Sequence, residues 1–163
     1  MSTRSRIGIQ DADGSIRSVY CHSDGYLSGV GDTLINHYAD PEKVEALIAL
    51  GDLSCLGEEI GEAHDFDEPR WGFQQGYNAE RAAQIKNWTV SYHRDRKEPL
   101  RIEKSPTEAD YLKAAEASWG EYVYLLRDGQ WLVHSYPGRE YGNGGFQPVV
   151  DAIAAENEAD EAA

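Results

Sequence analysis

The sequence has few of the residues that mark an exported, membrane-bound or disulfide-stapled protein. Among 163 residues there are only two cysteines, one methionine and 15 lysines and arginines. Two cysteines allow at most one bridge, which excludes a disulfide framework. No apolar run approaches the roughly 18 residues of a membrane-spanning helix, and the start MSTRSRIGIQ lacks the apolar stretch of a signal peptide. We therefore expect a cytoplasmic protein in which Cys21 and Cys55 are free thiols.

Acidic residues, in contrast, are abundant: 29 of them give a formal net charge of −14. Such a surface repels nucleic acid and anionic membranes, so we expect direct binding to neither. The acids concentrate between Asp40 and Glu68, where Lys43 is the single base. This stretch is either a solvated surface, which is the usual meaning of a charge run, or a carboxylate array that binds a basic partner as nucleic-acid mimics do. The candidate partner-binding residues are Glu42, Glu45, Glu58, Glu59, Glu62, Asp65, Asp67 and Glu68.

Alternating apolar residues and Asp-Gly turns predict two β-hairpins. The first covers residues 6–22, and the second covers 121–136 around the two-residue turn Asp128-Gly129. Both faces of the second hairpin are apolar or aromatic, so we expect it inside the sheet. Residues 87–96, NWTVSYHRDR, are predicted to form a further strand.

Helix signals lie between the strands. Residues 30–38 show helical spacing, and a second helix is predicted to begin with Asp40 as N-cap and Pro41 at the first helical position. A capping box at 105–108 begins a third helix, and a closing helix is predicted from residue 147. The sequence thus predicts an α+β fold with an antiparallel or mixed sheet of about five strands and three or four helices. One globular domain covers residues 1–155, followed by an acidic, disordered tail at 156–163.

Two segments repeat a His-x-Asp spacing: CHSD holds His22 and Asp24, and YHRDR holds His93 and Asp95. If both segments are strands, each imidazole and carboxylate pair shares one face, and together they offer ligands for zinc or a hard divalent ion. Alternatively, residues 24–25 are an ordinary Asp-Gly turn, and the second pair is an ion-paired, solvated strand end between two arginines.

Several stretches resemble a family of small uncharacterised proteins from bacteriophages and prophages. The similarity covers residues 2–57, 89–96 and 121–133, with a Ser-Thr-Arg start, a Tyr-Cys-His-x-Asp-Gly-Tyr strand end and a Leu-Gly-Asp-Leu-Ser turn. Ser23 stands where that family often has tryptophan. The family carries no known activity. The resemblance implies a phage or prophage setting, in which small acidic proteins often act on host defence or host enzymes.

Three functions are compatible with these features. The first is a phage-encoded, non-enzymatic binding protein that inhibits a basic host protein of the nucleic-acid-processing type, in the manner of anti-CRISPR or anti-restriction proteins. It would need no cofactor or metal and would act in the cytoplasm of the bacterial host as a monomer or homodimer. The second is a small metal-assisted hydrolase or nuclease that uses the two His/Asp pairs. The third is an assembly or accessory protein that binds another phage protein.

Overall fold

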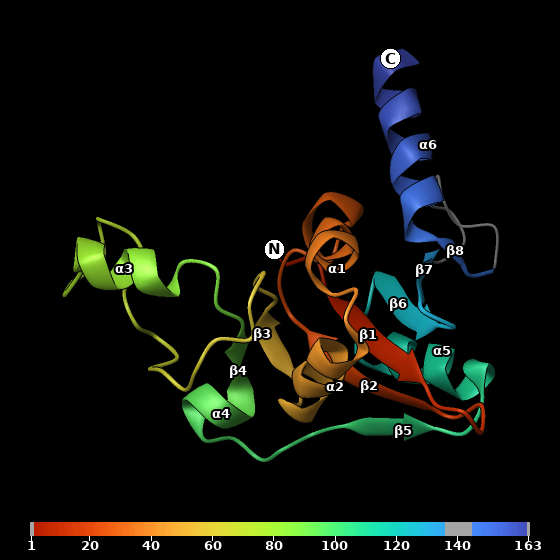
Figure 1. Ribbon diagram of the computed structural model, residues 1–163, viewed down its shortest axis with the longest axis horizontal. Helices are drawn as coiled ribbons and strands as arrows, with labels where there is room; N and C mark the ends of the chain where they lie inside the picture. Colours follow the sequence, from red (N-terminus) through yellow and green to blue (C-terminus); the bar gives the residue numbers. More distant parts are fainter. Residues whose placement is uncertain (1, 136–144, 163) are drawn as a thin grey trace.

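A computed structural model describes residues 2–135 and 145–162 of the chain (Figure 1). Within these residues, helices lie on both faces of one mixed β-sheet. The strands are β1 Ser5–Gln10, β2 Ile16–Cys21, β3 Leu53–Cys55, β4 Val90–Ser91, β5 Glu103–Ser105, β6 Tyr122–Arg127, β7 Gln130–Ser135 and β8 Gln147–Pro148. The helices are α1 Asp32–His37, α2 Pro41–Ala49, α3 Ala79–Ile85, α4 Tyr92–Arg96, α5 Glu108–Ala117 and α6 Val149–Ala162, with a π-helical turn, η1, at Leu27–Gly31.

The sheet has the order β4-β3-β2-β1-β6-β7-β8, and β5 pairs with the first half of β2 on the same edge as β3. The pairs β1–β6 and β2–β3 are parallel, and the others are antiparallel. The predicted α+β class is confirmed, but the described residues contain eight strands rather than about five. The three additional strands, β3, β5 and β8, have two or three residues each, which is too short for alternation to show in the sequence.

Both predicted hairpins are present. Asp128 and Gly129 both have positive φ, 52° and 76°, as a two-residue turn of type I′ requires. β6 lies between β1 and β7 in a sheet that carries helices on both faces, so residues on both faces of β6 are buried, as its sequence predicts. Tyr136, the last residue of the predicted second hairpin, lies outside the described residues.

The capping residues explain where the sequence predicted helices correctly and where it did not. The α2 start is confirmed, because the Asp40 side chain accepts a hydrogen bond from the Glu42 N–H. The N-cap of α5 is Thr107, two residues beyond the predicted one, since Ser105 belongs to β5. The prediction of one strand over 87–96 is wrong: only Val90–Ser91 is extended, and residues 92–96 form α4.

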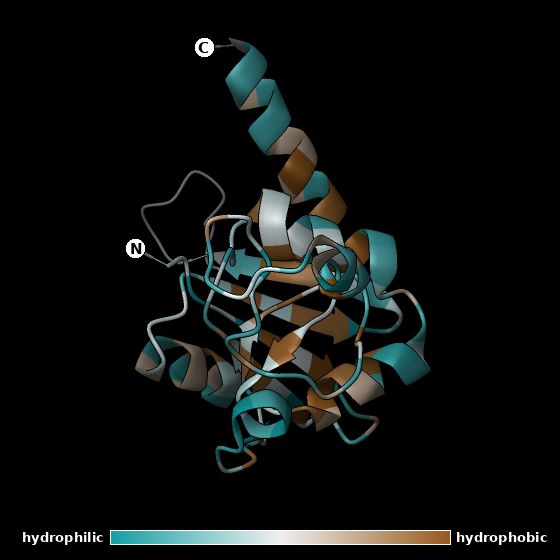
Figure 2. Ribbon diagram, turned by 90° about the vertical axis from the view of Figure 1, so that its left-hand side faces the viewer, coloured by the Kyte–Doolittle hydropathy of each residue, from teal (hydrophilic) through white to brown (hydrophobic). Residues whose placement is uncertain are grey.

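Two apolar layers flank the sheet. On one face, η1, α1, α2 and α6 cover Ile7, Val19, Tyr124 and Val133, and on the other face α5 covers Ile16, Val123 and Leu125. Gly8 on β1 gives α5 its close approach, because a Cβ there would lie 2.8 Å from the Tyr111 hydroxyl. In Figure 2 the hydrophobic colour accordingly concentrates on the strands of the sheet.

The C-terminal helix α6 begins close to the predicted position and continues to Ala162, into the stretch for which we expected a disordered tail. Alanine and glutamate have high helix propensity, which accounts for the continuation. Val149 and Ala152 are buried against the sheet, whereas residues 157–161 are exposed, and the helix projects from the sheet in both views (Figures 1 and 2). Neither α6 nor any other helix of the described residues is long and apolar enough to cross a membrane.

Candidate functional site

Residues 56–88 form a lobe beside the β3–β4 edge of the sheet, drawn in yellow and green in Figure 1. The lobe contains α3 and six of the eight acidic candidates, at positions 58, 59, 62, 65, 67 and 68. A bridge between Glu59 and Trp88 joins its two ends, and the Thr89 hydroxyl accepts a hydrogen bond from the Gly57 N–H. The two ends of the lobe are therefore joined to each other, and most of its acidic residues lie in the loop between these two ends.

The ion pair of Arg94 and Asp95 holds the lobe against α4. The Asp95 side chain is fully buried and accepts from Arg94 Nε at 2.9 Å and Nη2 at 3.1 Å. It also accepts from two backbone N–H groups, Ser91 at 2.8 Å and His64 at 3.1 Å. Arg94 donates in turn to the carbonyls of Ile60 and Thr89. This ion pair thus connects three chain segments around one carboxylate.

The electrostatics of Asp95 agree with a structural role. Burial on its own would raise the pKa of this carboxyl, but the hydrogen bonds from Arg94, Ser91 and His64 outweigh burial and hold the pKa below its ordinary value. Because the Asp95 carboxylate accepts four hydrogen bonds within the protein, it has no lone pair left to bind a substrate. Asp95, a candidate catalytic residue in the sequence, instead organises the lobe.

His64 and Trp88 pack against each other beside this ion pair. The His64 ring meets Trp88 edge-on, with 5.5 Å between centroids, and Nδ1 lies 2.8 Å from the Glu62 carbonyl oxygen. On the other side, Nε2 lies 3.2 Å from Arg70 Nη2. Because a guanidinium only donates, Nε2 accepts here and the proton belongs on Nδ1. His64 is therefore held by contacts within the lobe and by Asp95, whose Oδ1 lies 3.5 Å from His64 Nδ1.

The acidic candidates separate into neutralised and free carboxylates. Arg17 donates to both oxygens of Glu45, and Arg81 pairs with Glu68, which lowers the pKa of each of these two carboxyls. Glu58 lies 3.6 Å from His37 Nε2. Among the described residues, five candidates form no ion pair, and four of these five lie in the lobe: Glu42, Glu59, Glu62, Asp65 and Asp67.

Exposed aromatic side chains accompany the free carboxylates in the lobe. Phe73 is 88% exposed, Trp71 63% and Tyr77 40%. Trp71 and Tyr77 line an apolar hollow of about 240 Å³ against the alanines of α3, with Arg70 and Lys86 at its rim. Large exposed aromatic residues on a surface otherwise rich in charge are typical of interaction sites. None of these three side chains was among the candidate residues that the sequence indicated.

The His/Asp pairs do not assemble into a metal centre. His22 Nδ1 lies 2.7 Å from the Tyr20 hydroxyl, and the Asp24 carboxylate accepts from the Tyr26 hydroxyl in a turn where Asp24 has a φ of 54°. His93 Nδ1 contacts the Glu98 carbonyl oxygen at 2.6 Å, and Asp95 is committed as described above. Across residues 2–135 and 145–162, no three His, Cys, Asp or Glu side chains come together in a way that could hold a metal ion.

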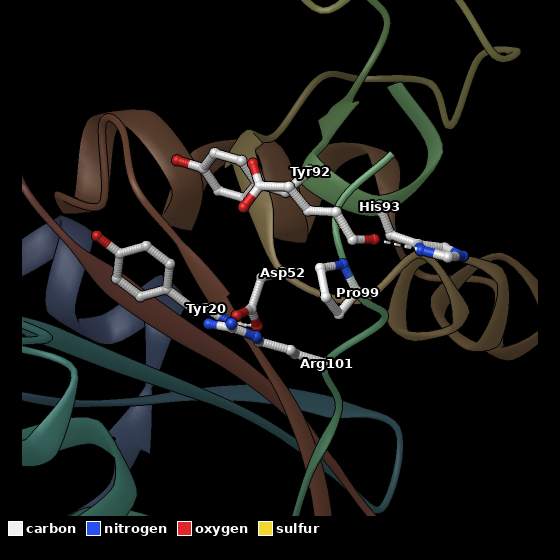
Figure 3. A pocket seen from close by; sticks show the side chains of 7 residues that line it. Tyr20, Asp52, Tyr92, His93, Pro99 and Arg101 are labelled. Atoms are coloured by element: carbon white, nitrogen blue, oxygen red, sulfur yellow. Dashed lines mark hydrogen bonds between the residues drawn. The ribbon is translucent and has the colours of Figure 1, made fainter. Parts of the chain in front are cut away.

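A second feature, which the sequence did not reveal, is an interruption of the sheet edge beside β2. β5 pairs with Ile16–Ser18 and β3 pairs with Cys21, so neither strand reaches Tyr20. The Tyr20 N–H donates instead to Asp52 Oδ1 at 2.9 Å. Residues 97–102 cross this interruption, and the hollow that results is lined by Tyr20, Asp52, Tyr92, His93, Glu98, Pro99 and Arg101 (Figure 3).

Gly51 allows residues 97–102 to lie this close to the sheet. Its φ is +76°, and a Cβ at this position would lie 2.8 Å from Leu100 Cδ1 and 3.1 Å from the Arg101 carbonyl oxygen. The same glycine follows the C-cap residue of α2, where its positive φ ends the helix.

Comparison with known proteins adds no relative. The chain matches no protein-family model, no curated protein and no solved structure. The resemblance to phage proteins therefore stays an expectation from the sequence.

Proposed function

We propose that this protein is a non-enzymatic binding protein and that the lobe, residues 56–88, is its contact surface for a basic partner. The observation that carries the proposal is the combination of free carboxylates at Glu59, Glu62, Asp65 and Asp67 with exposed aromatic side chains in one fastened segment. Carboxylates attract and orient a partner rich in arginine and lysine, and buried aromatic anchors supply most of the affinity at protein interfaces.

The nature of the partner follows from charge and from the resemblance. A protein with a net charge of −14 is complementary to the basic surfaces that nucleic-acid-processing proteins present to their substrate. Taken with the phage-like stretches of the sequence, this supports a phage-encoded inhibitor of a host defence machine, of the anti-CRISPR or anti-restriction type, in the bacterial cytoplasm.

The test uses charge reversal with a matched control. The variant E59K/E62K/D67K changes three exposed lobe side chains that form no ion pair with another described residue. The control E158K/D160K/E161K makes the same change in net charge on exposed positions of α6. Each protein is expressed in bacterial strains that carry an active CRISPR–Cas or restriction system, and the plating efficiency of a targeted phage is measured.

We expect the wild-type protein and the α6 control to raise plating efficiency in at least one such strain and the lobe variant to lose this effect. Exposed charges contribute only about 0–1 kcal/mol per pair to stability, so all three proteins should melt at similar temperatures. Equal protection by the lobe variant and wild type would contradict the proposed surface. Failure to protect in every strain, together with undiminished capture of a basic protein, would contradict the defence-inhibitor role but not the surface.

A further inference from the structure

Two neighbouring hollows lie at the interruption of the sheet edge beside β2, and they share Asp52 and Arg101 as lining residues. The first, of about 200 Å³, contains the aromatic side chains of Tyr20 and Tyr92. The second, of about 290 Å³, contains Arg6. An aromatic compartment thus adjoins a compartment with two guanidinium groups, on a part of the molecule that the lobe proposal does not use.

Arg6 is a buried cation without a buried anion. It is 7% exposed, and its guanidinium donates to the Ser18 hydroxyl, the Ser18 carbonyl and the Ser118 hydroxyl. None of these acceptors is charged, and no carboxylate of the described residues forms an ion pair with it. A guanidinium has five N–H donors, so two remain. A buried charge is costly unless an anion compensates it. The carboxylates of Asp52 and Glu103 line the same hollow but form no ion pair with Arg6, so its two remaining N–H groups are open to a bound anion.

Arg101 and Asp52 supply further free groups. The Arg101 side chain extends from the crossing segment toward Asp52 and Tyr20 (Figure 3), and it makes neither a hydrogen bond nor an ion pair within the described residues. Asp52 Oδ1 accepts from the Tyr20 N–H, which leaves Oδ2 as an acceptor. The nearby Glu98 is paired with Arg96 at 2.9 Å. The lining therefore offers two cationic donors, the carboxylates of Asp52, Glu98 and Glu103, and aromatic rings.

We propose that these hollows bind a small organic anion that carries a planar ring with N–H donors, of which a nucleoside monophosphate is the simplest biological example. Arg6 and Arg101 bind the phosphate, since guanidinium groups match its geometry. Tyr20 and Tyr92 flank the ring, and Asp52 accepts from a ring N–H or amino group. Asp52 and the exposed Glu103 offset the two arginines, so a bare phosphate gains less than a ligand that also donates hydrogen bonds.

The experiment measures binding of AMP, CMP, GMP and UMP to the wild-type chain by calorimetry and by NMR shift changes. Inorganic phosphate and the corresponding nucleosides separate the contribution of the anion from that of the ring. We expect saturable binding of at least one nucleotide, and weaker binding of its nucleoside and of phosphate. Arg101→Ala should weaken binding about tenfold or more, because a hydrogen bond to a charged group is lost.

Two further variants complete the test. Tyr20→Leu should weaken binding about fivefold or more through loss of ring contact, and Lys113→Ala, an exposed cation on α5, should leave binding unchanged. These variants leave the buried Arg6 in place, so each should fold, which circular dichroism verifies. No nucleotide with a Kd below about 1 mM, equal binding of phosphate and nucleotide, or unchanged binding by Arg101→Ala would each overturn the proposal.

Discussion

Replacement of Asp95 by asparagine should destabilise the protein strongly, although the change is nearly isosteric. The fully buried carboxylate accepts from Arg94 at 2.9 and 3.1 Å and from the N–H groups of Ser91 and His64. Asparagine removes the charge that compensates Arg94 and turns an NH₂ group toward donors. Breaking a buried ion pair from one side costs about 3–5 kcal/mol. Because Arg94 is 15% exposed, we expect about 3 kcal/mol, which is roughly 6–12 °C in Tm for a chain of this length.

The matched control is Asp67→Asn, the same substitution at an exposed lobe position, where a change within about 0.5 kcal/mol is expected. Urea denaturation followed by circular dichroism gives the free energy of unfolding, and hydrogen exchange reports the lobe separately. We expect faster exchange in residues 56–88 than in β1 and β6. If Asp95→Asn proves as stable as Asp67→Asn, the assignment of Asp95 as the anchor of the lobe is refuted.

The pH dependence supplies a second readout for Asp95. Its folded pKa lies below the value of about 3.9 in the unfolded chain. A lowered pKa means that its contribution to stability is fully present above pH 4–5 and declines as the pH falls toward the folded pKa. The difference in unfolding free energy between wild type and Asp95→Asn should therefore be constant near neutral pH and shrink below about pH 4.

Three other changes test separate parts of the structure. Gly51→Ala should lower the free energy of unfolding by more than about 1 kcal/mol. The loss should exceed that of Gly129→Ala, because Gly129 shares a φ of +76° but has open space where a Cβ would lie. Equal losses would exclude the contact with Leu100 as a cause. Burial raises the pKa of Cys21 to about 12 and raises that of Cys55, so both thiols should react slowly with a thiol reagent in the native protein. After unfolding without reductant, both should titrate as free thiols, and finding no free thiol would reveal a disulfide. Truncation after Glu156 should leave Tm unchanged, because residues 157–161 are exposed, and a fall of several degrees would show that the end of α6 packs.

The helices and strands that were predicted correctly are those whose ends are determined by residues close together in the sequence. Asp40 and Pro41 fix the start of α2, and the Asp-Gly pair at 128–129 fixes the second hairpin, through contacts within a few residues. Residues 92–96 were assigned to a strand because they follow directly on the β-prone residues 88–90. Their helix depends on the Ser91 cap and on the lobe carbonyls that Arg94 binds, more than 30 residues away in sequence.

The same distinction applies to the candidate sites. Composition showed where the carboxylates concentrate, but not that Glu45 is neutralised by Arg17, 28 residues away, or Glu68 by Arg81. The hollow beside β2 brings together residues 20, 52 and 101, none of which belongs to a recognisable motif. A hydroxyl, a carboxylate and a guanidinium at such separations carry no pattern until the fold places them side by side.

The most direct test of the central claim is capture of a basic partner from bacterial lysate by three immobilised proteins: wild type, E59K/E62K/D67K and H22A/H93A. If the lobe is the contact surface, wild type and the histidine variant capture the same protein and the lobe variant does not. Capture should weaken steeply with added salt, as the Debye length falls from about 10 Å at 0.1 M to about 3 Å at 1 M. Loss of capture in the histidine variant, with full capture by the lobe variant, would show that the lobe is not the contact surface.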